Sequence, residues 1–261
     1  LDSVVDEDAG AETSTDASTR GAPSTSTAAT QVVRGPAAFH NDDSHPYAGG
    51  MTARARGVVA GFRAGQLSLE DVATSLFGFE GFRPGQREAV ERVLGGKSTL
   101  VVLPTGSGKS SIYQLPAFLV DGVVLVVTPL VSLMADQLSN LPPDLIGATI
   151  NSTQSYEMRK TIEAELKAGR ISILFVSPEL LETKRFRKVL AEISVAFVAI
   201  DEAHCVSEWS HNFRPAYLRL HQTLASEFGV TTFLGLTATA TAATVDAIVD
   251  SLSLDRNGDP G

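Results

Sequence analysis

The feature that most constrains the fold is a glycine-rich segment, residues 103–110 (LPTGSGKS). It follows an apolar, β-branched run, residues 99–102, of the kind that forms a strand buried on both faces. The two glycines allow a tight turn whose backbone N–H groups converge on one point. A helix that begins after such a turn favours an anion at its free N–H groups. The segment therefore predicts a cradle for the phosphates of a nucleotide.

The side chains of this turn have expected tasks. Lys109 supplies a positive charge for the β- and γ-phosphates, and the Ser110 hydroxyl is placed to hold Mg²⁺. The common form of the motif has glycine where this chain has Leu103, and the form found here resembles a helicase phosphate loop more than a kinase one. A glycine-rich turn with a chance lysine is the alternative. The other expected nucleotide contacts in the turn are Thr105, Gly106, Ser107, Gly108 and Ser111.

A second apolar run, residues 195–200, ends in two adjacent acids, Asp201 and Glu202. Their charges repel each other, and burial at the end of a strand raises the cost. A bound Mg²⁺ would offset it: Asp201 would hold the metal opposite Ser110, and Glu202 would orient and deprotonate the attacking water. An ordinary acidic turn is the alternative. With the phosphate loop upstream, we predict Lys109, Asp201 and Glu202 as the catalytic residues.

Strands and helices alternate along the chain, which predicts an α/β fold with a parallel sheet, helices on both faces and ligands at the carboxyl ends of the strands. The expected strands are residues 98–103, 123–127, 146–150, 171–176, 195–200 and 230–236. The expected helices are one capped by Ser68 and ended by Gly78, one from Pro84 to Gly95, and 109–119, 131–140, 154–168, 215–228 and 241–252. Pro116 should kink or shorten the helix that contains it.

The first 50 residues differ in composition from the rest. Residues 1–30 have almost no large apolar side chains and cannot repay the entropy of ordering. Eight acids against two arginines give residues 1–50 a charge of −6, out of −9 for the chain. We expect a disordered acidic tail over 1–50 and one folded domain over 51–261. Because most of the negative charge lies in the tail, it does not argue against a nucleic-acid partner for the folded part.

Composition narrows the class of protein further. The densest apolar run, residues 123–127, is far too short to span a bilayer, and no secretion signal is visible. The single cysteine, Cys205, excludes an internal disulfide framework and a cysteine-based zinc site. Beside it there is no base-plus-orienter pattern of a thiol enzyme, so packing is the expected role of Cys205. A reducing, intracellular location is the simplest interpretation.

Six segments carry recognisable motifs: 77–86 (FGFEGFRPGQ), 104–110 (PTGSGKS), 128–134 (TPLVSLM), 201–204 (DEAH), 207–215 (SEWSHNFRP) and 235–240 (GLTATA). In this order they resemble the adenine-binding motif, motifs I, Ia and II, the aromatic-rich loop and motif III of RecQ-family DNA helicases. The aromatic-rich loop separates that family from DEAD- and DEAH-box RNA helicases. The Ser-His-Asn of the loop and residues 141–143 (LPP) resemble the Rothmund–Thomson helicase branch.

This resemblance covers about residues 68–252 and implies a RecA-like P-loop NTPase domain, the first of two lobes. It implies an ATP-dependent DNA helicase, moving 3′ to 5′ with ATP and Mg²⁺, that acts on single strands and junctions in replication, recombination or repair. Such a protein would be nuclear in a eukaryote, as the tail suggests, and cytoplasmic otherwise. The partner lobe and its arginine finger are not in the chain, so we expect weak ATP–Mg²⁺ binding, very slow hydrolysis and no unwinding by this chain alone.

The resemblance also implies an adenine site made by Phe82, Arg83 and Gln86. The Gln86 amide can pair with the edge of the base, and Arg83 can stack or bond there. A solvated Gln86 in the first turn of a helix is the alternative.

Five residues around the aromatic-rich loop are expected to bind DNA or relay its presence. Trp209 and Phe213 would stack on bases, at roughly 1–3 kcal/mol per base, and Arg214 would contact a phosphate. Core packing of Trp209 is the competing interpretation. His204 and His211 resemble family residues that relay between DNA and nucleotide, but each could equally be structural.

Four hydroxyl groups and one amide complete the expected DNA contacts and their coupling. Thr128, Ser132 and Gln137 would touch the phosphodiester backbone, with helix capping as the alternative. Residues 177–180 resemble motif Ib, with the same expected role and the same alternative. Thr237 and Thr239 would link the nucleotide site to DNA, unless their loop merely caps the next helix. The basic cluster within residues 184–188 is interpreted as a solvated face.

Two rival functions stay open. One is an RNA-dependent ATPase of the same superfamily, although the aromatic-rich loop favours DNA. The other is a replication or repair scaffold that keeps the lobe for DNA binding alone. Comparing DNA with RNA as stimulators of ATP hydrolysis distinguishes the RNA-dependent ATPase from a DNA helicase. ATP hydrolysis by the full-length protein that is lost in Glu202→Gln would exclude the scaffold.

Overall fold

The computed structural model describes residues 33–34, 48–151, 154–206 and 215–254. By internal contacts the chain divides into two units, residues 1–30 and 31–261, and all described residues belong to the second.

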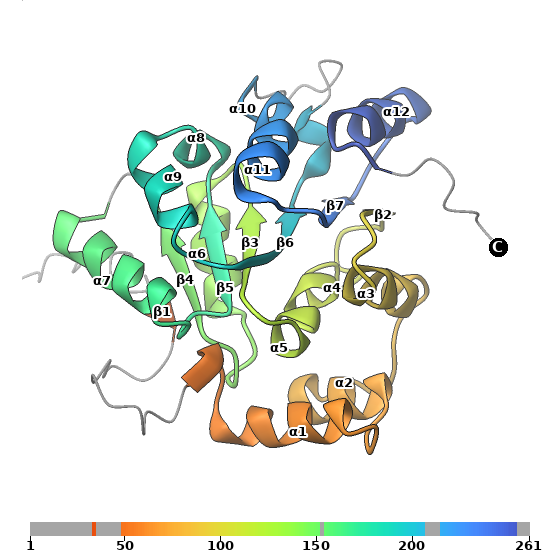
Figure 1. The fold of residues 1–261 in the computed structure, drawn as a ribbon. Helices are drawn as coiled ribbons and strands as arrows, with labels where there is room; N and C mark the ends of the chain where they lie inside the picture. Colours follow the sequence, from red (N-terminus) through yellow and green to blue (C-terminus); the bar gives the residue numbers. More distant parts are fainter. Residues whose placement is uncertain (1–32, 35–47, 152–153, 207–214, 255–261) are drawn as a thin grey trace, which may run out of the picture. The chain divides into compact units, whose positions relative to one another are not determined.

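A seven-stranded sheet forms the centre of the described part. Its spatial order is β1 (Val33–Arg34), β4 (Gly147–Ile150), β5 (Ile173–Val176), β3 (Val123–Val127), β6 (Val195–Ile200), β7 (Phe233–Thr237) and β2 (Thr99–Val102) (Figure 1). Strands β2 to β7 run parallel, and β1 lies antiparallel to β4. Strands β3, β4, β5 and β7 are buried along their whole length, which explains why their sequences are apolar without alternation.

Helices cover both faces of the sheet. They are α1 (Ala53–Arg63), α2 (Leu69–Phe77), α3 (Gln86–Leu94), α4 (Ser111–Gln114), α5 (Pro116–Leu119), α6 (Val131–Ser139), α7 (Tyr156–Lys167), α8 (Pro178–Leu181), α9 (Lys184–Leu190), α10 (Pro215–Leu218), α11 (Leu220–Phe228) and α12 (Ala242–Ser251), with 3₁₀ turns at Ala48–Gly50 and Ala203–Val206. Strand β3 shows the two layers directly. Val124 and Val126 pack in a core with α1 to α6, whereas Val123, Leu125 and Val127 pack in a second core with α7, α9, α11 and α12.

All six strands expected from the sequence are present, and the helix capped by Ser68 is confirmed in detail. Ser68 and Asp71 form a reciprocal capping box, and Gly78 ends the helix at φ 70°. Pro116 divides the expected helix 109–119 into α4 and α5, and the expected helix 215–228 is divided at Arg219 into α10 and α11. Helices α1, α8 and α9 were not expected; hydroxyl side chains at Thr52, Ser177 and Thr183 cap them.

Two pieces of the segment 1–50 depart from the expectation of a disordered tail. Val33 pairs with Ala148 along the open edge of β4, and the Gly50 carbonyl accepts a hydrogen bond from the Ile146 N–H. An exposed strand edge offers unpaired backbone groups, which explains why the short strand β1 pairs there. The other residues of that segment lie outside the described part. No described helix combines the length and the apolar character needed to cross a bilayer.

Candidate nucleotide-binding site

The phosphate loop begins where β2 ends, at the carboxyl edge of the parallel sheet. Gly106 and Gly108 have φ values of 79° and 80°, in the left-handed region that favours glycine. The Lys109 ammonium donates to the carbonyl oxygens of Leu103 (2.9 Å) and Pro104 (3.1 Å). The lysine therefore lies across its own loop, where phosphate oxygens could replace the two carbonyl groups as acceptors.

Gln86 braces this loop from the first turn of α3. Only 3% of the residue is exposed; its Oε1 accepts from the Arg83 N–H (2.9 Å), and its Nε2 donates to the carbonyl oxygens of Ser107 (2.9 Å) and Gly108 (3.2 Å). The Arg83 guanidinium donates to the Gly106 carbonyl (2.5 Å). The solvated alternative for Gln86 is thus wrong, because the amide is buried against the loop. Its contact with adenine stays a prediction, as does that of half-buried Phe82, which packs against the first core.

Asp201 follows β6 and is 7% exposed. Its Oδ1 accepts from the Glu202 N–H (3.0 Å) and its Oδ2 from Gln137 Nε2 (2.5 Å). Burial raises the pKa of the Asp201 carboxyl; the Gln137 and Glu202 hydrogen bonds and the Lys109 charge oppose that rise. Gln137 also accepts a hydrogen bond from Tyr113 of α4, so Asp201 lies beside the helix that follows the phosphate loop. The phosphate loop and the acid pair therefore meet at one place, the carboxyl edge of the sheet.

The donors at this place fit Mg²⁺. Burial, and after it the Asp201 charge, raise the pKa of the Tyr113 phenol. Ser110 begins the helical turn of Tyr113, whose N–H donates to the Ser110 carbonyl (3.3 Å), and Gln137 links the Tyr113 hydroxyl to Asp201. A hydroxyl and a carboxylate offer the oxygen donors that Mg²⁺ prefers, and Mg²⁺ usually keeps several waters and substrate phosphates as its other ligands. Among the described residues no group of three or more His, Cys, Asp or Glu side chains could hold a metal by itself. A site completed by nucleotide phosphates matches both facts.

The second acid of the pair connects to the end of β7. Glu202 has φ 51°, a left-handed conformation that is uncommon and strained for a residue other than glycine. His204 Nδ1 lies 3.2 Å from a Glu202 carboxylate oxygen and 3.1 Å from the Thr237 hydroxyl, which donates to the Thr239 carbonyl (3.0 Å). The loop after β7 caps the next helix, α12, through Thr241, as the alternative expected, and Thr237 and Thr239 are not the capping residues. Their link to DNA stays a prediction.

Two of the three DNA contacts expected after β3 are corrected by the structure. Thr128 is fully buried, because its N–H continues the sheet by donating to the Val176 carbonyl; its hydroxyl cannot reach a DNA backbone here. Gln137 is half-buried, and its amide bonds Asp201 and Tyr113 instead of a DNA backbone. Ser132 is exposed on α6, and no side chain caps that helix, so only its predicted DNA contact stays open.

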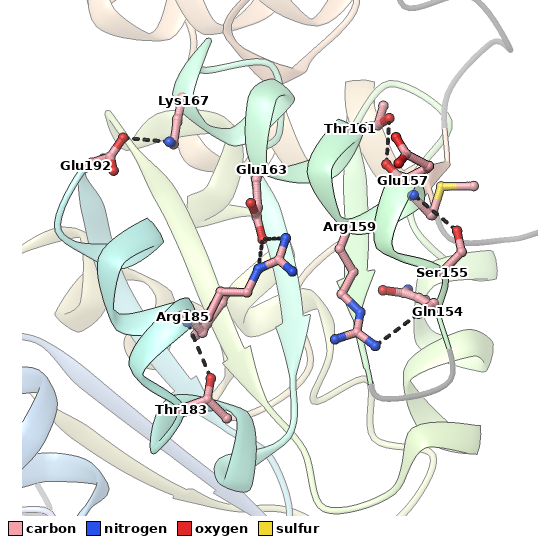
Figure 2. Close-up of polar contacts among 12 residues, drawn as sticks. Gln154, Ser155, Glu157, Arg159, Thr161, Glu163, Lys167, Thr183, Arg185 and Glu192 are labelled. Atoms are coloured by element: carbon pink, nitrogen blue, oxygen red, sulfur yellow. Dashed lines mark hydrogen bonds and ion pairs between the residues drawn. The ribbon is translucent and has the colours of Figure 1, made fainter.

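The remaining predicted residues divide into two groups. Trp209, His211, Phe213 and Arg214 lie outside the described residues. Ser177 caps α8, as the alternative for motif Ib foresaw. The basic cluster on α9 is partly paired: Figure 2 shows Arg185 against Glu163 of α7, at 2.9 Å, and Arg187 pairs with Glu227.

Sequence reasoning missed one residue of this site, Tyr113. It is 1% exposed, and its hydroxyl donates to Gln137 Oε1 (2.8 Å). A tyrosine in an apolar helix looks like an ordinary core residue, so the sequence holds no signal for this contact.

Comparison with known proteins agrees with the motifs. Residues 83–248 match the model of the DEAD/DEAH box helicase family. The chain is 47% identical over 193 residues to ATP-dependent DNA helicase Q-like 5 of Arabidopsis thaliana, covering 73% of this chain and 21% of that protein. It is 46% identical over 192 residues to human ATP-dependent DNA helicase Q4 (72% and 16%) and 44% identical over 184 residues to RecQ of Haemophilus influenzae (70% and 30%). The chain spans less than a third of each of these relatives.

Solved structures agree on the fold. The helicase domain of Pyrococcus furiosus Hef has a TM-score of 0.52 at 21% identity, covering 69% of this chain and 38% of that one. Mycobacterium smegmatis helicase Lhr, bound to single-stranded DNA and AMP-PNP, has a TM-score of 0.51 at 21% identity, covering 76% and 26%. The phosphate loop, the acid pair and two thirds of the sequence thus agree with one assignment: the chain belongs to the DEAD/DEAH box helicase family and, within it, is similar to RecQ-type DNA helicases.

Proposed function

We propose that this chain is the nucleotide-binding lobe of an ATP-dependent DNA helicase that separates strands while moving 3′ to 5′. The observation that carries the proposal is the hydrogen-bonded link from Asp201 through Gln137 to Tyr113, which places the Asp201 carboxylate beside the helix that follows Lys109 and Ser110. Lys109, Ser110 and Asp201 supply the cation, hydroxyl and carboxylate that a triphosphate and its Mg²⁺ require. The relatives named above are ATP-dependent DNA helicases, which supports DNA as the nucleic-acid partner.

In this proposal each residue acts through groups already described. Bound Mg²⁺ would neutralise charge on the phosphates, with Ser110 and Asp201 holding it. Lys109 exchanges its two carbonyl acceptors for phosphate oxygens, and the glycine-rich loop turns its N–H groups to the same anion. Glu202 orients the attacking water and takes its proton. The Lys109 charge helps to keep the buried Asp201 carboxyl ionised, as metal binding requires.

Communication with DNA is proposed to run from Glu202 through His204 to Thr237. The His204 ring contacts Glu202, the proposed base, and Thr237, the last residue of β7. It therefore joins the hydrolytic acid to the loop that follows β7. Ser132 on α6 and the aromatic side chains Trp209 and Phe213 are the proposed DNA contacts, with Arg214 on a phosphate and His211 as a relay. DNA as partner would make the protein nuclear in a eukaryote and cytoplasmic in a bacterium.

The test is Glu202→Gln, with fluorescent ATP binding and single-turnover hydrolysis measured on the chain. We expect ATP binding within about two-fold of wild type, because the phosphate contacts remain, and hydrolysis about 10²- to 10⁴-fold slower, the usual contribution of a general base. Glu192→Gln, at the opposite end of the sheet, is the matched control and should leave both unchanged. Hydrolysis at the wild-type rate in Glu202→Gln would contradict the role given to Glu202.

The nucleic acid is tested in the same assay by adding single-stranded DNA or RNA of one length. Stimulation of wild-type hydrolysis by DNA in preference to RNA is expected. Stronger stimulation by RNA would identify an RNA-dependent ATPase instead. A wild-type chain that binds DNA but neither binds nor hydrolyses ATP would favour the scaffold.

A further inference from the structure

Three side chains from three different elements form a hydrogen-bonded row that ends at Asp201. Tyr113 of α4 donates its hydroxyl to Gln137 Oε1 (2.8 Å), and Gln137 of α6 donates its Nε2 to Asp201 Oδ2 (2.5 Å). Tyr113 is 1% exposed and Asp201 7% exposed, so water does not substitute freely for these contacts. We call these residues the Asp201 row.

The chemistry of its members fixes the direction of the row. An ionised carboxylate only accepts hydrogen bonds, so the amide must turn its NH₂ group to Asp201. The amide oxygen then faces Tyr113, whose hydroxyl serves as donor. A flipped Gln137 would set its oxygen against the carboxylate and leave the phenol hydrogen without this acceptor. The carboxylate therefore selects the amide orientation, and the phenol holds the amide in it by donating to its oxygen.

The row leaves the carboxylate able to hold a metal. Gln137 takes one acceptor site on Oδ2 and the Glu202 N–H takes one on Oδ1. Two carboxylate oxygens offer about four lone-pair sites, so others stay available. The two bonds fix the carboxylate plane from both sides, as groups that support metal ligands do in many proteins.

Helix α6 also connects this row to the surface proposed to meet DNA. Met134 and Leu138 anchor the helix in the core, whereas Leu130, Val131 and Ser132 are exposed at its start. Gln137 lies on the same short helix, so a shift of α6 moves the amide relative to Asp201.

We propose that Gln137 is a positioning residue for Asp201 and that Tyr113 holds its amide in the binding orientation. The proposal rests on the proposed function in one respect, the use of Asp201 to hold Mg²⁺. It goes beyond that function by assigning two residues that touch neither nucleotide nor metal.

The test measures binding of a fluorescent ATP analogue to the chain over a Mg²⁺ titration and in EDTA. In Gln137→Leu the Mg²⁺ concentration for half-maximal binding should rise about 10- to 100-fold, the usual effect of losing a group that orients a metal ligand. Affinity in EDTA should not change, because the phosphate loop is intact. Tyr113→Phe, which removes one oxygen atom, should shift the midpoint in the same direction by a smaller factor. In the Gln137→Leu background it should add nothing.

Matched substitutions away from the site are the controls. Gln222→Leu changes an exposed glutamine of α11, and Tyr156→Phe keeps the ring that the Arg185 guanidinium covers at 4.8 Å. Both should titrate like wild type. Thermal unfolding verifies that each variant is folded, and if Gln137→Leu does not fold, Tyr113→Phe decides by itself.

The outcomes separate the two proposals. Wild-type chain whose nucleotide binding ignores Mg²⁺ overturns the proposed function and, with it, the role of the row. Mg²⁺-dependent binding in wild type with an unchanged midpoint in both variants overturns the row alone. A lower midpoint in the variants also overturns it, because Gln137 would then compete with the metal. Independent, additive effects of the two substitutions would contradict the order Tyr113, Gln137, Asp201.

Discussion

The two ends of the parallel sheet bury polar groups in opposite ways. At the carboxyl end Asp201 is buried with a raised pKa, the Thr128 hydroxyl is buried without a hydrogen-bond partner, and Glu202 has a left-handed backbone. At the amino end a hollow of about 540 Å³ lies between α1 and the loops that precede β3, β5 and β6. Charges on its rim are paired and solvated, as in Arg63–Asp121 (2.8 Å) and Lys167–Glu192 (2.6 Å; Figure 2).

The larger hollow and the chemically unusual residues thus lie at opposite ends of the sheet. The amino-end hollow is roomy, yet its charged groups neutralise one another at the surface, where ion pairs contribute little. The carboxyl end keeps a buried acid, an unpaired hydroxyl and a strained backbone. Each of these lowers the free energy of unfolding, so their presence together indicates a functional requirement. Packing of the two cores on either side of the sheet maintains those features. The groups that lower stability therefore identify the functional end of the sheet better than the size of the hollow at the other end does.

The largest expected effect is a difference in ATP affinity between two lysine substitutions, one at each end of the sheet. Lys109→Ala removes the cation of the phosphate loop and should abolish detectable binding of ATP, a loss of at least about 100-fold, because charge-assisted contacts to several phosphate oxygens disappear. Lys167→Ala, the control at the amino end, should leave ATP affinity unchanged and lower the free energy of unfolding by about 1 kcal/mol or less. Equal ATP affinity in both variants would contradict the claim that the phosphate loop binds ATP.

A pair of glycines gives the next effect. A Cβ atom at Gly108 (φ 80°) would lie 2.7 Å from Gln86 Nε2, and at Gly122 (φ 104°) it would lie 2.6 Å from the Ser194 carbonyl oxygen. Each glycine-to-alanine change should lower the free energy of unfolding by about 1–3 kcal/mol, the cost of a strained backbone. Only Gly108→Ala should also weaken ATP binding, since it displaces the amide that braces the loop. Chemical denaturation and nucleotide titration of both variants measure this; weakened ATP binding in Gly122→Ala would break the division.

The smallest effect has opposite signs at the two ends. Thr128→Val removes a buried hydroxyl that has no partner and should raise the free energy of unfolding by about 1 kcal/mol. Thr99→Val, at the amino end of β2, removes a hydroxyl that accepts from Arg92 Nε (3.0 Å) and donates to the Lys97 carbonyl (3.0 Å), and should lower it by about 1 kcal/mol. Shifts of opposite sign in the unfolding midpoint, about 2–4 °C per kcal/mol, are expected. The same sign in both would show that the Thr128 hydroxyl is not a cost.

Local sequence predicted the parts of this structure that depend on local causes. Unbroken apolar runs predicted all six parallel strands, because strands buried on both faces have no polar side. The glycine turn with Lys109, and the acid pair Asp201–Glu202 at a strand end, are also local patterns. Their meeting followed from the rule that ligands bind at the carboxyl ends of parallel strands.

The errors arose where a side chain's environment depends on tertiary contacts. Thr128 lies one residue beyond β3, and only its pairing with β5 decides that it is buried. Gln137 is polar and lies on a helix of mixed character, so nothing local indicates that its amide points at Asp201. Helix α1 was missed because Gly57, Gly61 and its arginines obscure the apolar spacing. In each case the deciding contact comes from a residue far away in sequence.

The most direct test of the central claim is a crystal structure of the chain with a non-hydrolysable ATP analogue and Mg²⁺. The account predicts phosphates against the N–H groups of residues 106–110, Lys109 released from the Leu103 and Pro104 carbonyls, and a metal bound by Ser110 and Asp201. A triphosphate bound elsewhere, with Lys109 still on those carbonyls, would contradict it.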